Sequence, residues 1–232
     1  TSVRPDMMPP SVHEIEAVVR MQERFNRHVD ARWHQKHYPF TRAVLVEVAE
    51  ALDHYGWKWW SKQPSYHEQV ALELIDVLGL LVSDVLQQCG GRCDVAVTQI
   101  VSRCMSDGDL CELDGTVHNL GEYGVPDLLD LLAALSICRR NAFVVLSRLF
   151  DRMGLTWDNV VTIFCAKTAL NIFRQDHGYR SGTYRKYWGD KEDNEHLSDV
   201  LAYIKPLGMR TDALFDHVYD ALILRYAEMQ ST

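Results

Sequence analysis

Two pairs of acidic residues stand out because each pair interrupts a long apolar stretch of the chain. Glu47 and Glu50 form the first pair, and Glu73 and Asp76 form the second. Within each pair the residues are three positions apart, so on a helix both side chains lie on one face. Carboxylate oxygens are the ligands that Mg²⁺ and Mn²⁺ prefer in proteins. The four acidic side chains are therefore candidate ligands of a divalent cation.

The apolar surroundings of these acids favour a metal site. A helix that is apolar around nearly its whole circumference is expected to be buried. A buried carboxylate costs several kcal/mol unless it is paired or binds metal, and neither helix carries a matching set of basic residues. The alternative is that the acids face solvent or pair with distant arginines. A di-iron site is the rival metal site, but such bundles use Glu-x-x-His pairs, and positions 50 and 76 are not histidine.

Polar and basic residues near position 170 form a second candidate site. Lys167, Asn171 and Arg174 recur at helical spacing and form one stripe. A glycine-rich stretch follows, and it contains Arg180, Tyr184 and Lys186. Glycine allows a ligand to approach the backbone closely, and Arg and Lys make charge-assisted hydrogen bonds to phosphate oxygens. The stretch predicts phosphate binding, with a solvated helix end and a basic loop as the alternative.

Two amides in an apolar helix face suggest a base pocket. Gln22 and Asn26 lie in the same stripe as the apolar residues of the first expected helix. A buried amide needs partners, and its donor and acceptor can both read the edge of a pyrimidine. A Gln–Asn pair satisfied within the core explains the pattern equally well. Trp57 follows the second expected helix, where it either walls the base pocket or packs in the core or a dimer interface.

Helical periodicity extends along the chain, and no region shows sustained alternation of period two. The expected fold is all-α, a helical bundle with a mobile insertion. Residues 1–88 and 127–232 form the expected catalytic core, and residues 89–126, rich in glycine and cysteine, form the insertion of short helices and loops. Helices are expected over 11–30, 41–55, 66–88, 127–150, 158–176, 195–204 and 210–229.

Composition excludes several classes of protein. The chain has 232 residues and a net charge of −8, which argues against nonspecific binding of nucleic acid. No apolar run is long enough for a membrane span, and no signal sequence is evident, so an intracellular protein in the cytoplasm or nucleus is expected. The six cysteines are expected to be reduced thiols. A zinc site of Cys89, Cys93, Cys104, Cys111 and His118 is disfavoured by their irregular spacing.

Taken together, these motifs resemble the dimeric dUTPases, which belong to the all-α nucleoside triphosphate pyrophosphatase superfamily. The paired acids mark the superfamily. The segment Trp57-Lys-Trp-Trp60 and the pattern running from Asn171 through Gly182 to Tyr184 resemble the kinetoplastid-like and phage-like branch. The resemblance covers residues 18–84 and 158–201.

The resemblance implies an activity and a role for each candidate residue. The activity is Mg²⁺-dependent hydrolysis of dUTP, and also of dUDP, to dUMP and pyrophosphate or phosphate by a homodimer. This reaction limits uracil incorporation into DNA and supplies dUMP for dTMP synthesis. The implied metal ligands are Glu47, Glu50, Glu73 and Asp76, and Glu47 also activates the attacking water. The implied substrate-binding residues are Gln22, Asn26 and Trp57 around uracil and Lys167, Asn171, Arg174, Arg180, Tyr184 and Lys186 near the sugar and phosphates.

Two positions depart from the pattern of these relatives. Gly79-Leu80 stands where many of them carry a larger His-Phe pair near the base, and Arg180 replaces a frequent Lys. The first departure leaves the nucleotide specificity open. Hydrolysis of another nucleotide, such as dCTP, or of several, therefore remains an alternative, as does a helical interaction protein that has lost catalysis.

Overall fold

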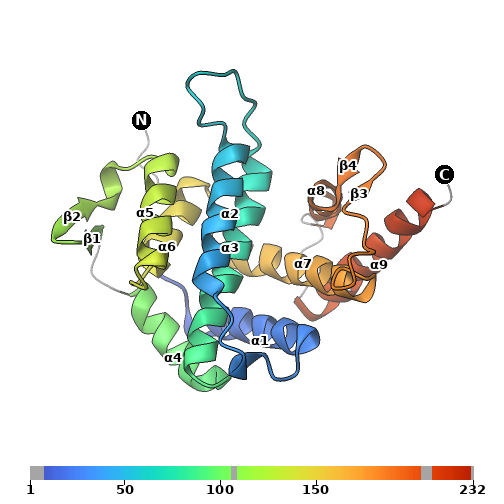
Figure 1. Ribbon diagram of the computed structural model, residues 1–232, viewed down its shortest axis with the longest axis horizontal. Coiled ribbons are helices and arrows are strands. Elements are labelled where there is room, and N and C mark those ends of the chain that lie inside the picture. The colour runs from blue at the N-terminus through green and yellow to red at the C-terminus, as the bar shows by residue number, and fades with distance from the viewer. Residues whose placement is uncertain (1–7, 106–108, 205–210, 231–232) are drawn as a thin grey trace.

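The computed structural model describes residues 8–105, 109–204 and 211–230. In this part of the chain the fold is all-α, with two small hairpins, as the periodicity predicts (Figure 1). The helices are α1 (Val12–Val29), α2 (Phe40–Tyr55), α3 (His67–Gln88), α4 (Cys93–Cys104), α5 (Val125–Ile137), α6 (Phe143–Arg152), α7 (Trp157–Asp176), α8 (Asp193–Ile204) and α9 (Thr211–Gln230). The strands are β1 (Leu110–Leu113), β2 (Thr116–Asn119), β3 (Tyr187–Trp188) and β4 (Lys191–Glu192).

Local signals in the sequence set the ends of several helices. The Ser11 hydroxyl accepts from the Glu14 backbone N–H at 3.2 Å, and the Glu14 carboxylate accepts from the Ser11 N–H at 2.7 Å. This capping box starts α1, and Thr156 and Asn159 form another at the start of α7. At the end of α3, Gly90 adopts a positive φ that favours glycine, and the helix stops there as predicted.

An antiparallel hairpin of α2 and α3 forms the centre of the molecule, and α1 and α7 cross it at its lower end (Figure 1). Helix α3 is buried along most of its length, as its apolar sequence predicts. Helix α2 differs from the expectation. Val44, Val48 and Ala51 are buried against α3 and α5, whereas Leu45 and Val46 are 44% and 51% exposed on the other face. An apolar circumference therefore does not bury α2 within one chain.

The prediction of one helix over 127–150 is wrong, because the chain forms α5 and α6 with a turn between them. Arg139 takes a positive φ of 56° there, which ends α5. The Asn141 side chain then accepts from the Phe143 N–H and starts α6. Apolar periodicity on both sides of the turn is nearly continuous, so periodicity alone does not reveal the break.

The region 89–126 contains more regular structure than the expected short helices and loops. Helix α4 has 12 residues and packs on α1 and α3, with Ala96 and Ile100 fully buried. β1 and β2 then pair as an antiparallel hairpin around Asp114-Gly115, two residues with positive φ. Strands of four residues are too short to give a clear alternating pattern. Movement of this region remains a prediction.

The carboxyl-terminal part surrounds the end of α7. The β3–β4 hairpin leads into α8, and α9 packs along α7. Phe173 of α7 is fully buried and packs edge-to-face against Tyr184, Tyr219 and Tyr226. This aromatic cluster fixes the end of α7 and the loop that follows it. In the described residues, no helix combines the length and apolar character of a membrane span.

Candidate active site

Three of the four predicted acidic side chains meet between α2 and α3. Carboxylate oxygens of Glu47, Glu73 and Asp76 all lie within 4.8 Å of one another. The i, i+3 spacing on α3 turns Glu73 and Asp76 toward α2, and Glu47 approaches from the facing side of that helix. We call these three residues the acid cluster. Glu50 lies one turn along α2, is exposed and is not part of it.

The acid cluster is closed on one side by basic and amide groups from α7 and α8. Lys167 is 1% exposed, and its Nζ lies 2.8 Å from Asp76 Oδ2 and 2.7 Å from Asn194 Oδ1. Asn194 in turn extends its Nδ2 toward Glu73 Oε1 at 3.5 Å. Within the described residues, Lys167 is the cation in direct contact with Asp76 and His54 lies beside Glu73, which does not balance the charge of three carboxylates.

Incomplete charge compensation is evident in the protonation of Glu47. Burial, and then the charges of Asp76, Glu73 and Glu50, raise the pKa of Glu47 to about 8. A carboxyl group that holds its proton near neutral pH lies in a site where additional negative charge is unfavourable. A bound divalent cation reverses this balance. The hard oxygen donors and the uncompensated charge therefore fit Mg²⁺ or Mn²⁺.

Glu73 responds differently because His54 lies beside it. Burial favours the neutral form of Glu73, but the His54 hydrogen bond and the Lys167 charge outweigh it and lower the pKa of Glu73. His54 Nε2 lies 3.6 Å from Glu73 Oε1, and this contact raises the pKa of His54. Glu73 is thus held as an anion, whereas Glu47 is the member of the acid cluster whose pKa is raised to about 8.

Arg174 is held by a buried carboxylate. Asp193, at the start of α8, is fully buried and accepts two hydrogen bonds from Arg174, at 2.8 and 2.7 Å. Tyr184 donates to the same carboxylate at 2.7 Å, and Arg174 also donates to Asn171 Oδ1 at 3.0 Å. Burial favours protonated Asp193, yet the bonds from Arg174 lower its pKa. The guanidinium is therefore fixed at the edge of the acid cluster.

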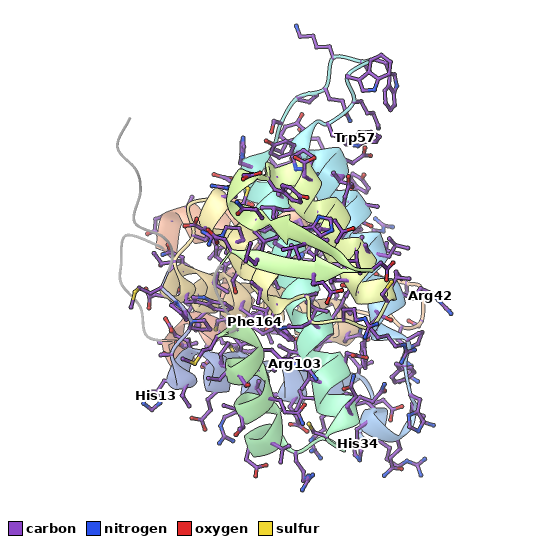
Figure 2. All side chains as sticks on the ribbon, turned by 90° about the vertical axis from the view of Figure 1, so that its left-hand side faces the viewer. His13, His34, Arg42, Trp57, Arg103 and Phe164 are labelled. Atoms are coloured by element: carbon purple, nitrogen blue, oxygen red, sulfur yellow. The ribbon has the colours of Figure 1, made fainter. Side chains whose placement is uncertain are left out.

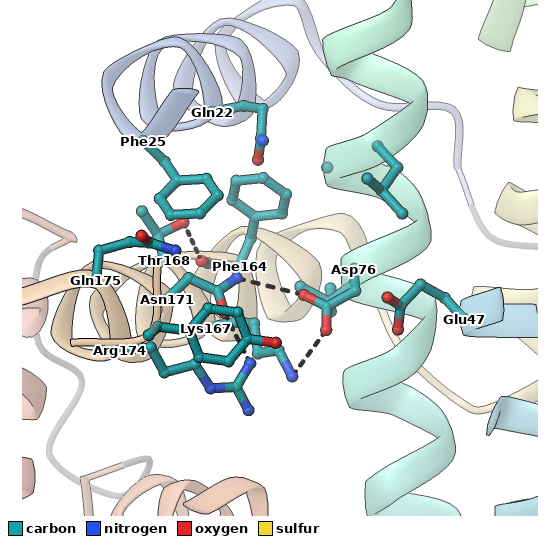
Figure 3. Close-up of a pocket in the computed structure, with 14 residues that line it drawn as sticks. Gln22, Phe25, Glu47, Asp76, Phe164, Lys167, Thr168, Asn171, Arg174 and Gln175 are labelled. Atoms are coloured by element: carbon teal, nitrogen blue, oxygen red, sulfur yellow. Dashed lines mark hydrogen bonds and ion pairs between the residues drawn. The ribbon is translucent and has the colours of Figure 1, made fainter. Parts of the chain in front are cut away.

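A cavity of about 180 Å³ opens beside the acid cluster, between α1, α3 and α7 (Figure 3). One end is polar and carries Glu47, Asp76, Lys167, Asn171 and Arg174. The other end is lined mainly by aromatic and apolar groups, Phe25, Ile75, Gly79, Leu80 and Phe164, with the polar side chains of Gln22, Thr168 and Gln175 among them. A flat apolar ring with a charged tail matches this division.

Comparison with known protein families identifies the family to which this chain belongs. Residues 14–179 match the dUTPase family, and this match covers well over half of the chain. The chain belongs to the dUTPase family. It is therefore a hydrolase that acts on dUTP as a diphosphatase, and the predicted resemblance and enzyme class are confirmed. No curated protein matches the chain.

The structure divides the predicted substrate-binding residues of this dUTPase into two groups. Gln22, Lys167, Asn171 and Arg174 line the cavity. Asn26 is buried directly behind Gln22 and donates to Ser83 Oγ at 2.8 Å, as in the alternative of a satisfied core pair. Gln22 Nε2 is hydrogen-bonded within the core, as in that alternative, and the Gln22 side chain also borders the cavity, so a role of the two amides at the base stays a prediction.

The remaining predicted residues do not line the cavity. Trp57 is 42% exposed at the base of the loop between α2 and α3, which projects from the molecule, and it lies well apart from Phe164 (Figures 1 and 2). Arg180 donates to the Val29 carbonyl oxygen at 2.8 Å, and Lys186 Nζ lies 3.2 Å from Glu192. Tyr184 is bound to Asp193 behind Arg174. A role for these residues at the substrate stays a prediction.

Several residues of the site were not predicted. His54 follows Glu50 by four residues on α2, so helical spacing alone places it on the face of the acids. Ser83 follows Asp76 by seven residues and lies on its face for the same reason. Asp193 and Asn194 come from beyond a loop, and no local spacing in the sequence connects them with Arg174 or Lys167. The cysteine and histidine residues of the disfavoured zinc site do not gather in the described part of the chain.

Proposed function

We propose that this dUTPase hydrolyses dUTP to dUMP and pyrophosphate, and dUDP to dUMP and phosphate, with Mg²⁺ bound at the acid cluster. Mn²⁺ is the expected substitute. The observation that supports the proposal is the grouping of three carboxylates within 4.8 Å beside a cavity with an apolar end. In a cell this reaction would limit uracil in DNA and supply dUMP for dTMP synthesis.

Glu47, Glu73 and Asp76 are the residues that would hold the cation. When bound, a divalent cation supplies Lewis acidity at the phosphoryl group and lowers the pKa of a water molecule. Glu50 is a proposed additional ligand, because it lies one turn from Glu47 and its charge already contributes to the raised pKa of Glu47. Its exposed side chain would have to turn toward the cluster.

Glu47 is the proposed base for the attacking water. It borders the cavity, and burial and the neighbouring acids raise its pKa to about 8, so it takes up a proton more readily than an ordinary carboxylate. Glu73, held as an anion by His54, and Asp76, paired with Lys167, are less suited to exchange a proton. Glu47 would accept a proton from the water molecule as the water oxygen attacks phosphorus.

Lys167 and Arg174 would stabilise negative charge on the phosphate oxygens. Both line the cavity, and both are held by buried partners, Asn194 and Asp193. Groups fixed before the reaction need no rearrangement as charge develops, so their stabilisation is greatest in the transition state. Asn171, Arg180, Tyr184 and Lys186 complete the proposed sugar and phosphate set. Arg180 and Lys186 are exposed on the loop after α7 and would have to leave their present partners.

The apolar end of the cavity is the proposed base subsite. Phe25 and Phe164 line it, and Gln22 presents a polar group beside Phe164 (Figure 3). Asn26 acts there through its contact with Gln22. Trp57 is proposed to reach the base only if the loop between α2 and α3 folds over the site. The region 89–126 is a second candidate for closure over the substrate.

The protein is proposed to be a homodimer. Leu45 and Val46 expose an apolar face on α2, and the adjoining loop exposes Trp59 and Trp60 at 88% and 57%. Large exposed apolar patches are typical of subunit interfaces. Because α2 also carries Glu47, pairing through this face would place the acid cluster close to the partner.

The function is tested by measuring pyrophosphate release from dUTP, dCTP, dTTP and UTP with and without Mg²⁺. We expect dUTP to be the preferred substrate and chelation to abolish turnover. Glu47→Gln should lower kcat by about 100-fold or more, the typical contribution of general base catalysis. Glu16→Gln, at an exposed pair with Arg20, is the matched control and should retain full activity. Equal turnover of dCTP, or unchanged activity of Glu47→Gln, would overturn the proposal.

A further inference from the structure

The amide of Gln22 is held in one orientation by a buried network. Gln22 Nε2 donates to Asn26 Oδ1 at 2.9 Å and to Ser83 Oγ at 3.0 Å. Asn26 Nδ2 donates to the same Ser83 oxygen at 2.8 Å. Ser83 is fully buried, and Gln22 and Asn26 are 8% and 7% exposed. Both protons of the Gln22 amide are therefore used inside the protein.

The oxygen of that amide is left for a ligand. Among the described residues, Gln22 Oε1 has no hydrogen-bond donor, and it is not fully enclosed by protein. Figure 3 shows the amide end of Gln22 directed into the cavity toward Phe25 and Phe164. The base end of the cavity thus contains a hydrogen-bond acceptor whose orientation is set from behind.

Ser83 decides this orientation, because its single proton is already committed. The Ser83 hydroxyl donates to the Gly79 carbonyl oxygen at 2.8 Å, so toward the two amides Ser83 acts only as an acceptor. If the Gln22 amide turned over, its oxygen would face the oxygens of Ser83 and Asn26. Turning Asn26 as well would place its oxygen against Ser83. Only the observed arrangement pairs a donor with an acceptor at each contact of this network while Ser83 keeps its bond to Gly79.

Gly79 provides the space that the amide occupies. A Cβ atom at this position would lie 2.7 Å from Gln22 Oε1 and 3.3 Å from its Cδ, so any side chain would displace the amide. The glycine, which departs from the larger residue that many dimeric dUTPases carry there, is matched to the position of Gln22. The two features therefore belong to one recognition device in this chain.

We infer that Ser83 is a specificity-determining positioning residue, which holds Gln22 Oε1 toward the cavity so that it accepts the imide N3–H of uracil. The inference rests on dUTP being the substrate at this site. The pairing edge of uracil carries one donor, N3–H, between two carbonyl acceptors, so an inward-facing acceptor pairs with N3–H. Cytosine has an acceptor at the same ring atom, and two facing acceptors leave both desolvated and unpaired.

The test measures kcat and KM for dUTP, dCTP and N3-methyl-dUTP with the wild-type protein, Ser83→Ala and Gly79→Ala. The wild type should discriminate against dCTP and N3-methyl-dUTP. Ser83→Ala should reduce both preferences about tenfold, the size of one mispaired buried hydrogen bond, through a higher KM for dUTP at a preserved kcat. A general loss of structure would instead lower kcat for all three nucleotides.

Two further variants separate recognition from folding. Ser136→Ala is the matched control, since Ser136 is a buried helical serine that donates to the Leu132 carbonyl at 2.7 Å and lies away from the cavity. It should leave all preferences unchanged. Gly79→Ala should raise the KM for dUTP at a preserved kcat, because its Cβ displaces the Gln22 amide.

The outcomes distinguish this inference from the proposed function. If the wild type does not hydrolyse dUTP, the proposed function fails. If it hydrolyses dUTP but accepts N3-methyl-dUTP equally well, or if Ser83→Ala keeps the wild-type preference for dUTP over dCTP, the role of Ser83 is refuted and the proposed function stands.

Discussion

The buried pair of Arg174 and Asp193 allows a quantitative prediction about stability. Asp193 is fully buried, and its carboxylate receives two hydrogen bonds from Arg174 and one from Tyr184. Asp193→Asn keeps the size of the side chain but removes its charge, and the Arg174 guanidinium remains in place with 13% of its side chain exposed. An uncompensated buried charge costs about 3–5 kcal/mol.

This cost is a large part of the stability of a typical domain. Folded proteins are stable by about 5–15 kcal/mol, and for a chain of this size each kcal/mol corresponds to about 2–4 °C in Tm. Asp193→Asn should therefore lower Tm by about 6–20 °C. The control is Asp199→Asn, which removes exposed pairs with Lys191 and Arg225, whose side chains are 44% and 35% exposed. Such a surface pair contributes about 1 kcal/mol or less.

Thermal and urea unfolding of the wild type, Asp193→Asn and Asp199→Asn check this prediction. The effect should also depend on pH in a defined direction. Because the folded-state pKa of Asp193 is lowered, its contribution is present above the ordinary value of 3.8 and disappears as pH falls through the folded value. The difference between wild type and Asp193→Asn should thus shrink in acid. Equal Tm values for the two aspartate variants near neutral pH would refute the reasoning.

Three further predictions concern the metal and the assembly. Since burial and neighbouring acids raise the pKa of Glu47 to about 8, Mg²⁺ binding at pH 7 should release a proton, which calorimetry in buffers of different ionisation enthalpy detects as a difference in apparent binding enthalpy. A binding enthalpy at pH 7 that does not depend on the buffer would contradict this proton release. Without metal, the same raised pKa should make the free energy of unfolding fall as pH rises from 4.5 toward 8, and a stability that does not change over this pH range would contradict the assignment. Val46→Asp should shift the mass measured by light scattering from dimer to monomer, while Asp53→Asn, at the exposed end of α2, should not; a monomeric wild type would refute the pairing through α2.

Helical spacing is the reason the acid cluster could be predicted from sequence. Glu73 and Asp76 share a face of α3 because of the i, i+3 rule, and their apolar neighbours force that helix into the core. The facing position of Glu47 follows because α2 and α3 form one hairpin. The fold class and the approximate ends of most helices follow from the same local rules.

Helical spacing does not predict features that depend on contacts between segments far apart in the sequence. The burial of Asp193 against Arg174 depends on how β3, β4 and α8 fold back, which no local pattern encodes. The apolar sequence of α2 predicts burial on all sides, yet one face is exposed. The sequence does not specify whether the same chain or a partner covers that face. The break between α5 and α6 depends on the backbone of Arg139, a residue type that seldom adopts positive φ.

Diffraction from crystals soaked in Mn²⁺ tests the metal site most directly. Data collected at the manganese absorption edge locate the ion independently of the protein density. We predict an anomalous peak in contact with the carboxylate oxygens of Glu47, Glu73 and Asp76, which disappears in Glu73→Gln. A crystal that turns over dUTP yet shows no manganese at these three residues, or shows it elsewhere, would contradict the account.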